Sequence, residues 1–335
     1  MRITKSLLQK FAIETVKQRK RDEPDLHAAY LMGSVLSDDP LLGGTTDIDL
    51  MLVHRYLAAT PRETIALTPE ISLDIFHKTR DDYEPLRQFR QDPWMGYPLT
   101  NNHILLFDTD HWLEYIQATV TAEFHREDNV LKRVNALFSA ARDAWQTLLI
   151  SPPQNHLSWL DQYLQSLELG ANAIAGLIGP PLTERRFMIS FTERLETLGI
   201  PEVRAGFCGL LGCKDISNDQ YAPLIDSFEE DLHLIAGKDN CPAHLSPVRH
   251  SYYVQAFRAL TESDDPACLC WPLLRTWLDI QLAEDGKSPG CEAWQSLLEE
   301  LHLTETFIEE KFEGLDSYLD HLDVLIESWA DRYAY

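Results

Sequence analysis

The chain has 335 residues, of which 44% are hydrophobic and 24% are charged; this is the composition of a globular protein and excludes a disordered or collagen-like chain. Acidic residues (53) outnumber basic ones (29), and the net charge of −24 disfavours a nucleic-acid partner because an acidic surface repels a phosphate backbone. No apolar run approaches the roughly 18 residues that predict a membrane span. Residues 1–23 mix charged with apolar positions, which favours an amphipathic helix over a signal peptide. We therefore expect a cytoplasmic protein with no membrane partner.

Short apolar runs separated by turn residues predict a small mixed sheet in the first part of the chain. The run at 27–32 stops at a Gly-Ser pair, and a segment rich in turn residues follows it. The expected strands cover 27–32, 48–53, 71–76 and 103–108, and a helix is expected over about 110–124.

From about residue 129 the apolar residues recur at helical spacing, and no further strand is expected. The expected helices cover 130–150, 156–179, 183–199, 219–237, 251–263, 267–283, 291–303 and an amphipathic stretch from 307 to near the end. The fold class is therefore α+β, with a small mixed-sheet domain at 1–128 followed by an all-helical bundle domain at 129–335.

Three aspartates mark the strongest candidate site. Asp47 and Asp49 begin an apolar strand, and residues two apart in a strand face the same side. Asp74 lies at the centre of the apolar strand 71–76, so the three carboxylates meet if the two strands pair. Like charges at such a distance repel unless a cation or a proton lies between them. Clustered carboxylates of this kind predict a Mg²⁺ site.

The pair Gly33-Ser34 supplies hydrogen-bond donors, which complement the carboxylate acceptors of the aspartates. A strand that breaks at Gly-Ser exposes backbone N–H groups and a hydroxyl, which are donors suited to phosphate. The missing side chain at Gly33 lets a phosphate approach closely. A ligand that carries phosphate is therefore expected beside the Mg²⁺ site.

An apolar residue, Gly33-Ser34, a twelve-residue loop, and Asp47 and Asp49 between apolar residues form a motif that resembles the DNA polymerase β-like nucleotidyltransferase superfamily. The resemblance covers residues 25–110, and Asp74 matches the third acid of the motif. An all-helical second domain is also typical of the small-molecule branch, the aminoglycoside or kanamycin-type nucleotidyltransferases. The resemblance implies an enzyme that moves a nucleoside monophosphate from an NTP to a hydroxyl and releases pyrophosphate.

The same resemblance implies the role of each motif residue. Asp47, Asp49 and Asp74 would hold two Mg²⁺ ions, and Gly33 and Ser34 would bind the triphosphate, with ATP as the expected donor. Asp74 is the default candidate for the general base. The other is Glu168, on the predicted helix 156–179, because kanamycin-type enzymes use a glutamate from the helical domain. The sequence does not decide between them.

The acceptor is left open by the sequence. Most of the excess acidic residues follow residue 130, which favours a cationic, aminoglycoside-like small molecule. Two alternatives are adenylylation of a protein partner, as in toxin–antitoxin pairs, and a nucleotide sensor without catalysis. The oligomeric state is not indicated either.

Overall fold

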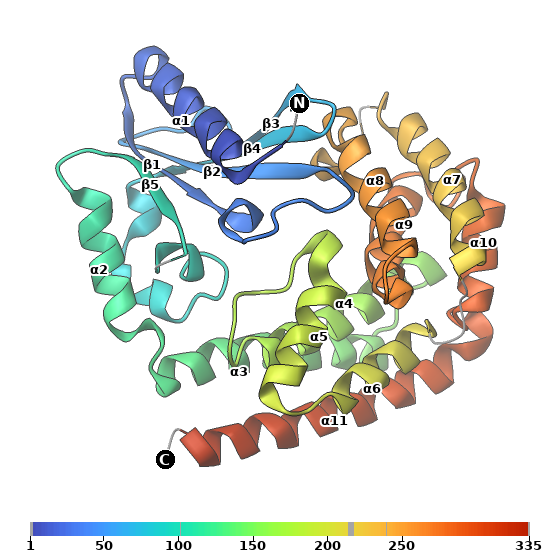
Figure 1. The fold of residues 1–335 in the computed structure, drawn as a ribbon. Helices are drawn as coiled ribbons and strands as arrows, with labels where there is room; N and C mark the ends of the chain where they lie inside the picture. Colours follow the sequence, from blue (N-terminus) through green and yellow to red (C-terminus); the bar gives the residue numbers. More distant parts are fainter. Residues whose placement is uncertain (1–2, 101, 214–217, 239, 334–335) are drawn as a thin grey trace. The chain divides into compact units, whose positions relative to one another are not determined.

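The computed structural model describes residues 3–100, 102–213, 218–238 and 240–333. The chain divides into two compact units, Met1–Asn129 and Val130–Tyr335. The first unit contains a five-stranded sheet and the second is helical, so the fold is α+β (Figure 1).

A mixed sheet forms the centre of the first unit, with strand order β3-β4-β2-β1-β5. Strands β2 and β4 are parallel, whereas the other neighbouring pairs are antiparallel. The elements of this unit are α1 (Lys5–Asp22), β1 (Leu26–Met32), β2 (Thr46–His54), β3 (Arg62–Thr68), β4 (Ile71–Thr79), β5 (Ile104–Asp108) and α2 (Trp112–Phe124).

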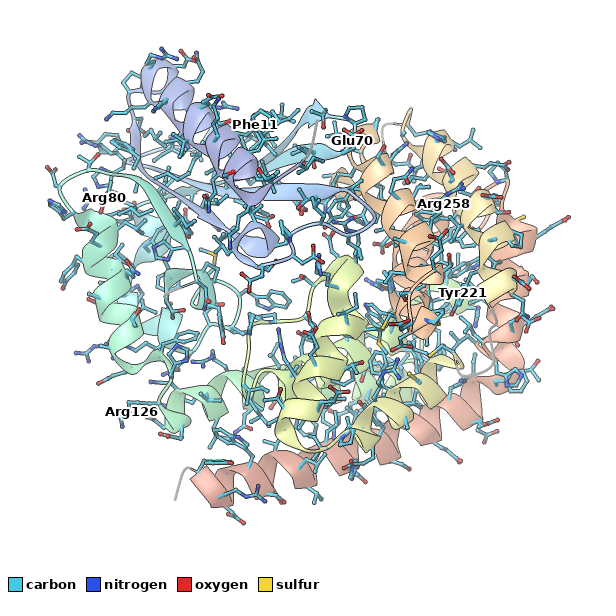
Figure 2. The ribbon with its side chains drawn as sticks, viewed as in Figure 1. Phe11, Glu70, Arg80, Arg126, Tyr221 and Arg258 are labelled. Atoms are coloured by element: carbon cyan, nitrogen blue, oxygen red, sulfur yellow. The ribbon has the colours of Figure 1, made fainter. Side chains whose placement is uncertain are left out.

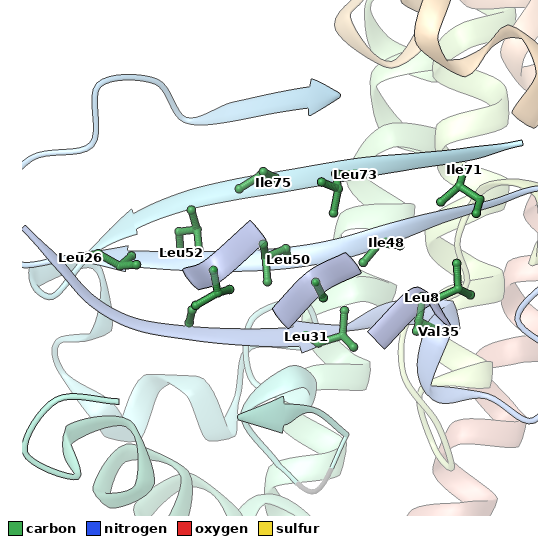
Figure 3. Close-up of a cluster of buried hydrophobic side chains, with 13 residues drawn as sticks. Leu8, Leu26, Leu31, Val35, Ile48, Leu50, Leu52, Ile71, Leu73 and Ile75 are labelled. Carbon is green, nitrogen blue, oxygen red and sulfur yellow. The ribbon is translucent and has the colours of Figure 1, made fainter. Parts of the chain in front are cut away.

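Both faces of the sheet are buried, as the apolar character of β2 requires. On one face, Leu50 of β2 and Leu73 of β4 pack with Leu8 of α1 (Figure 3). On the other face, Met51 of β2 packs with Val120 of α2. Alternate residues of β2 therefore enter two separate cores, and this alternation fixes which side chains share a face.

Strand β3 is absent from the sequence prediction. Every residue of Arg62–Thr68 is at least partly exposed, because β3 is an edge strand that pairs only with β4. A strand of this kind mixes polar and apolar residues and lacks the apolar run that identifies β2. The predicted strand 71–76 is consequently the second arm of a hairpin, β4.

The second unit is helical. Helix α3 begins in the last residues of the first unit and continues into the second. The helices are α3 (Glu127–Ile150), α4 (His156–Ala175), α5 (Phe187–Leu198), α6 (Glu202–Leu211), α7 (Asn218–Ile235), α8 (His250–Thr261), α9 (Cys270–Ala283), α10 (Cys291–Glu300) and α11 (Ile308–Tyr333). Within the described residues, no helix is both long and apolar enough to cross a membrane.

Helix α6 is also missing from the sequence prediction. It contains Gly206 and Gly209, which lower helix propensity by roughly 1 kcal/mol each. The glycines are tolerated because α6 packs closely on α11: a Cβ at Gly206 would lie 3.0 Å from the ring of Tyr318. Tertiary packing here outweighs local propensity.

Candidate functional site

The structure brings Asp47, Asp49 and Asp74 together. Because β2 and β4 are parallel and in register, Asp49 lies opposite Asp74, and Asp47 precedes Asp49 on the same face. Carboxylate oxygens of the three residues lie within 4.8 Å of one another. Only 6% of Asp47 and 1% of Asp74 are exposed, whereas Asp49 is half-buried.

The chemistry of this cluster fits a hard divalent cation. Burial of several carboxylates is unfavourable unless positive charge compensates them. All three groups offer oxygen, the donor that Mg²⁺ prefers. The turn between β3 and β4 contacts the start of β2, because the amide of Thr46 donates to the carbonyl of Glu70 over 3.0 Å (Glu70 is labelled in Figure 2).

Gly33 lies directly against this cluster, where β1 ends opposite Asp49. Its φ of +77° is unfavourable for residues with a side chain. A Cβ at this position would stand 1.8 Å from Asp49 Oδ2, which no side chain can tolerate. Two independent constraints therefore require glycine here, and the backbone approaches the carboxylate closely as a result.

Ser34 follows Gly33 in a short 3-10 turn, Gly33–Leu36, and is half-buried. Its hydroxyl oxygen lies 3.4 Å from that of Thr46, a long contact for two hydroxyls. The Thr46 hydroxyl in turn donates to the carbonyl of Asp47 over 3.1 Å. Ser34 and the aspartates thus lie near the same end of the sheet, where β1 ends and β2 begins.

Arg62 belongs to the site and was missed by the sequence analysis. It is the first residue of β3, and its Nε donates to Asp74 Oδ1 over 2.7 Å while its Nη2 donates to Asp74 Oδ2. Its guanidinium also lies 4.9 Å from the centre of the Phe76 ring. Recognition of β3 as a strand antiparallel to β4 would have placed Arg62 near Asp74 in advance.

A second cluster of potential ligands, Glu23, His54 and His77, lies on the opposite face of the sheet. His54 Nε2 and His77 Nδ1 are 2.9 Å apart, with the ring planes within 17°. This separation of the two ring nitrogens is that of a hydrogen bond between the rings.

The donors in this pair follow from its neighbours. Glu63 accepts a hydrogen bond from His77 Nε2 over 2.9 Å, so in a neutral ring the Nδ1 of His77 is the acceptor and His54 Nε2 the donor. Arg19 closes the network by donating to Glu63 and to Glu23 over 2.5 and 2.7 Å.

Burial and charge shift the pKa values within this network. Burial, and then the neighbouring His77, lowers the pKa of His54 below its usual range. Burial opposes the charged form of Glu63, but hydrogen bonds from Arg19 and His77 outweigh it and lower the pKa of Glu63. At neutral pH, His54 is therefore uncharged.

Glu168 lies in the second unit, on α4. Burial raises its pKa, and the nearby charge of Arg275 partly opposes this effect. Arg275 itself donates to Asp161 over 2.5 Å and approaches Asp279. Glu168 thus stands in an acidic environment with one arginine.

The sequence matches no protein-family model and no curated protein. The resemblance to nucleotidyltransferases therefore rests on the motif residues alone.

The geometry of Gly33 leads to a first prediction. We expect Gly33→Ala to lower the free energy of unfolding by about 1–3 kcal/mol, because it combines positive φ with a steric clash against Asp49. Urea unfolding of the two proteins measures the difference. The matched control is Gly199→Ala, which also has positive φ but no atom within 4 Å of the added Cβ. A loss no larger than that of the control contradicts the proposed clash.

The pKa of His54 leads to a second prediction. Because the folded-state value lies below the unfolded value of about 6.5, the unfolded chain takes up the proton first. The contribution of His54 to stability is thus complete above the unfolded-state pKa. It is lost as the pH falls from there through the lower folded-state pKa. We expect His54→Gln to reduce the fall in unfolding free energy between pH 7.5 and pH 5.5, measured by urea titration. An unchanged fall would contradict the lowered pKa.

Proposed function

We propose that the protein is a Mg²⁺-dependent nucleotidyltransferase that moves a nucleoside monophosphate, AMP from ATP in our expectation, to a hydroxyl of a small acceptor. The observation that carries this proposal is the juxtaposition of Asp47, Asp49 and Asp74 with Gly33 at one sheet edge. Neither a structural ion pair nor a simple turn requires three acids and a close glycine backbone in one place.

The aspartates would hold the cation through their oxygens, and Asp47 and Asp74 are buried enough to keep those oxygens in fixed positions. Bound Mg²⁺ would supply charge stabilisation at the transferring phosphoryl group. The backbone at Gly33 lies against Asp49, and the Ser34 hydroxyl that follows it would offer a hydrogen-bond donor to a phosphate bound at the cluster. These groups orient a triphosphate for in-line displacement and departure of pyrophosphate.

The acceptor is proposed to be cationic, of the aminoglycoside class. Support comes from the acidic residues of the second unit, including Asp161 and Asp279 beside Glu168. Glu168 is proposed as the general base, since a carboxylate whose pKa is raised accepts a proton more readily near neutral pH. Asp74 is the weaker candidate for this role because Arg62 donates to both of its oxygens.

A third prediction tests the proposed reaction. We expect pyrophosphate release from ATP that requires both Mg²⁺ and an acceptor from a panel of aminoglycosides and other amino-alcohols. Asp47→Asn/Asp49→Asn should reduce this release by about three orders of magnitude, because it removes the charge that holds the cation but keeps the side-chain shape. A coupled phosphate assay measures the rate, and Asp39→Asn, an exposed acid of the preceding loop, is the control.

The outcomes separate the alternatives. ATP binding that depends on the two aspartates but yields no pyrophosphate with any small acceptor would contradict the small-molecule proposal. It would favour a protein acceptor or a nucleotide sensor. Release that is unaffected by the double substitution would refute the proposed site itself.

A fourth prediction concerns Glu168. We expect Glu168→Gln to lower kcat about a hundredfold and to leave the KM for ATP unchanged, because a general base contributes roughly that factor or more. The pH–rate profile should also lose its acidic limb. Asp143→Asn removes an exposed carboxylate from the same unit and serves as the control. An unchanged kcat for Glu168→Gln would exclude the role of base.

A further inference from the structure

We propose that Arg62 competes with the divalent cation for Asp74, so that the site exchanges an internal arginine counter-ion for metal; this inference rests on the proposed metal site. The two N–H groups of Arg62 that face Asp74 each contact a different carboxylate oxygen. Such a two-pronged contact is the strongest geometry between arginine and a carboxylate.

Burial makes this counter-ion necessary in the absence of metal. Asp74 is 1% exposed, and a buried carboxylate without a compensating charge strongly destabilises a fold. Of the four groups Asp47, Asp49, Asp74 and Arg62, three are negative and one is positive. Arg62 thus provides part of the charge that a divalent cation would provide.

Arg62 and a cation cannot share Asp74 without penalty. A cation bound by the Asp74 oxygens would lie next to the guanidinium, and their repulsion is weakly screened at a buried group. The carboxylate can therefore satisfy one partner fully but not both. By thermodynamic linkage, each partner weakens the binding of the other by the same factor.

The position of Arg62 allows it to leave. It is the first residue of β3, the edge strand, and 32% of its side chain is exposed, in contrast to the 2% of the Asp74 side chain. Its guanidinium carbon also lies over the Phe76 ring, 4.9 Å from the ring centre, which is a second contact besides the one with Asp74. The arginine can turn towards solvent while Asp74 stays fixed in β4.

Arg62 is therefore a positioning residue that sets the metal affinity of the site. While Arg62 remains on Asp74, a cation at the site would bind through Asp47 and Asp49. Once Arg62 has left, all three acids serve as ligands. Cation binding at such a site is weakened while Arg62 holds Asp74, and the full ligand set forms only when the guanidinium is displaced.

The test is a measurement of Mn²⁺ affinity on the full chain by isothermal titration calorimetry and electron paramagnetic resonance, without any substrate. We expect Arg62→Met to lower the Kd about tenfold, within the range typical of coupled sites. Methionine removes the charge but keeps an apolar contact with Phe76. The Kd of Arg62→Lys should lie between the values of the wild type and Arg62→Met, because an ammonium keeps the charge but lacks the planar fork of a guanidinium. Arg87→Met, an exposed arginine of the same unit, controls for net charge.

A second measurement uses the wild-type chain and does not require any variant to fold. Phenylglyoxal labelling of Arg62, mapped by mass spectrometry, should rise when Mn²⁺ saturates the protein. Equal Mn²⁺ affinity in wild type and Arg62→Met, or labelling that Mn²⁺ leaves unchanged, would overturn the competition and leave the metal site standing. Absence of Mn²⁺ binding in both proteins would instead refute the metal site on which the proposed function depends. Asp47→Asn/Asp49→Asn shows the signal that is expected when this metal site is absent.

Discussion

Repulsion among three carboxylates at one edge of the sheet is the constraint on which the first unit depends. The parallel pairing of β2 with β4 places Asp49 opposite Asp74, and the alternation of β2 adds Asp47 on the same face. The two cores oppose a shift of register, because a slip by one residue would turn Asp47 and Asp49 into the apolar core that packs against α1. The fold thus holds the acids together and must compensate their charge, which Arg62 does in part and a divalent cation would complete.

The sequence was sufficient to predict the aspartates and Gly33 because each carries a local signal. A carboxylate is unusual in an apolar strand, and a Gly-Ser pair that ends such a strand is easily recognised. Arg62 had no signal of this kind: it begins an edge strand that resembles a loop, and its role exists only through its contact with Asp74 across the hairpin. The α+β class followed from periodicity, whereas β3 and α6 form through pairing and packing that a local pattern does not contain.

The pair His54 and His77 illustrates the same limit on the other face. Each histidine ends or follows an apolar run, and nothing in the run indicates that the rings meet. Their contact arises because β2 and β4 are in register over nine residues, from Thr46 to His54. The pairing that assembles the aspartates near the start of β2 therefore also assembles the histidines near its end. One set of backbone hydrogen bonds builds two polar clusters on opposite faces.

Helix α1 connects these two ends of the sheet. Near its first turn, Lys5 Nζ donates to the carbonyls of Leu36 and Ser37, which fixes the turn that begins at Gly33. Near its last turn, Arg19 bridges Glu23 and Glu63 and closes the histidine network. Between them, the apolar side of α1 packs on the sheet and prevents it from sliding (Figure 3). The Gly33 turn thus packs against Asp49 and is fixed through Lys5 by a helix whose other end is fixed by Arg19. A fixed backbone here would serve the proposed phosphate site, because a mobile backbone would have to be ordered at each binding event.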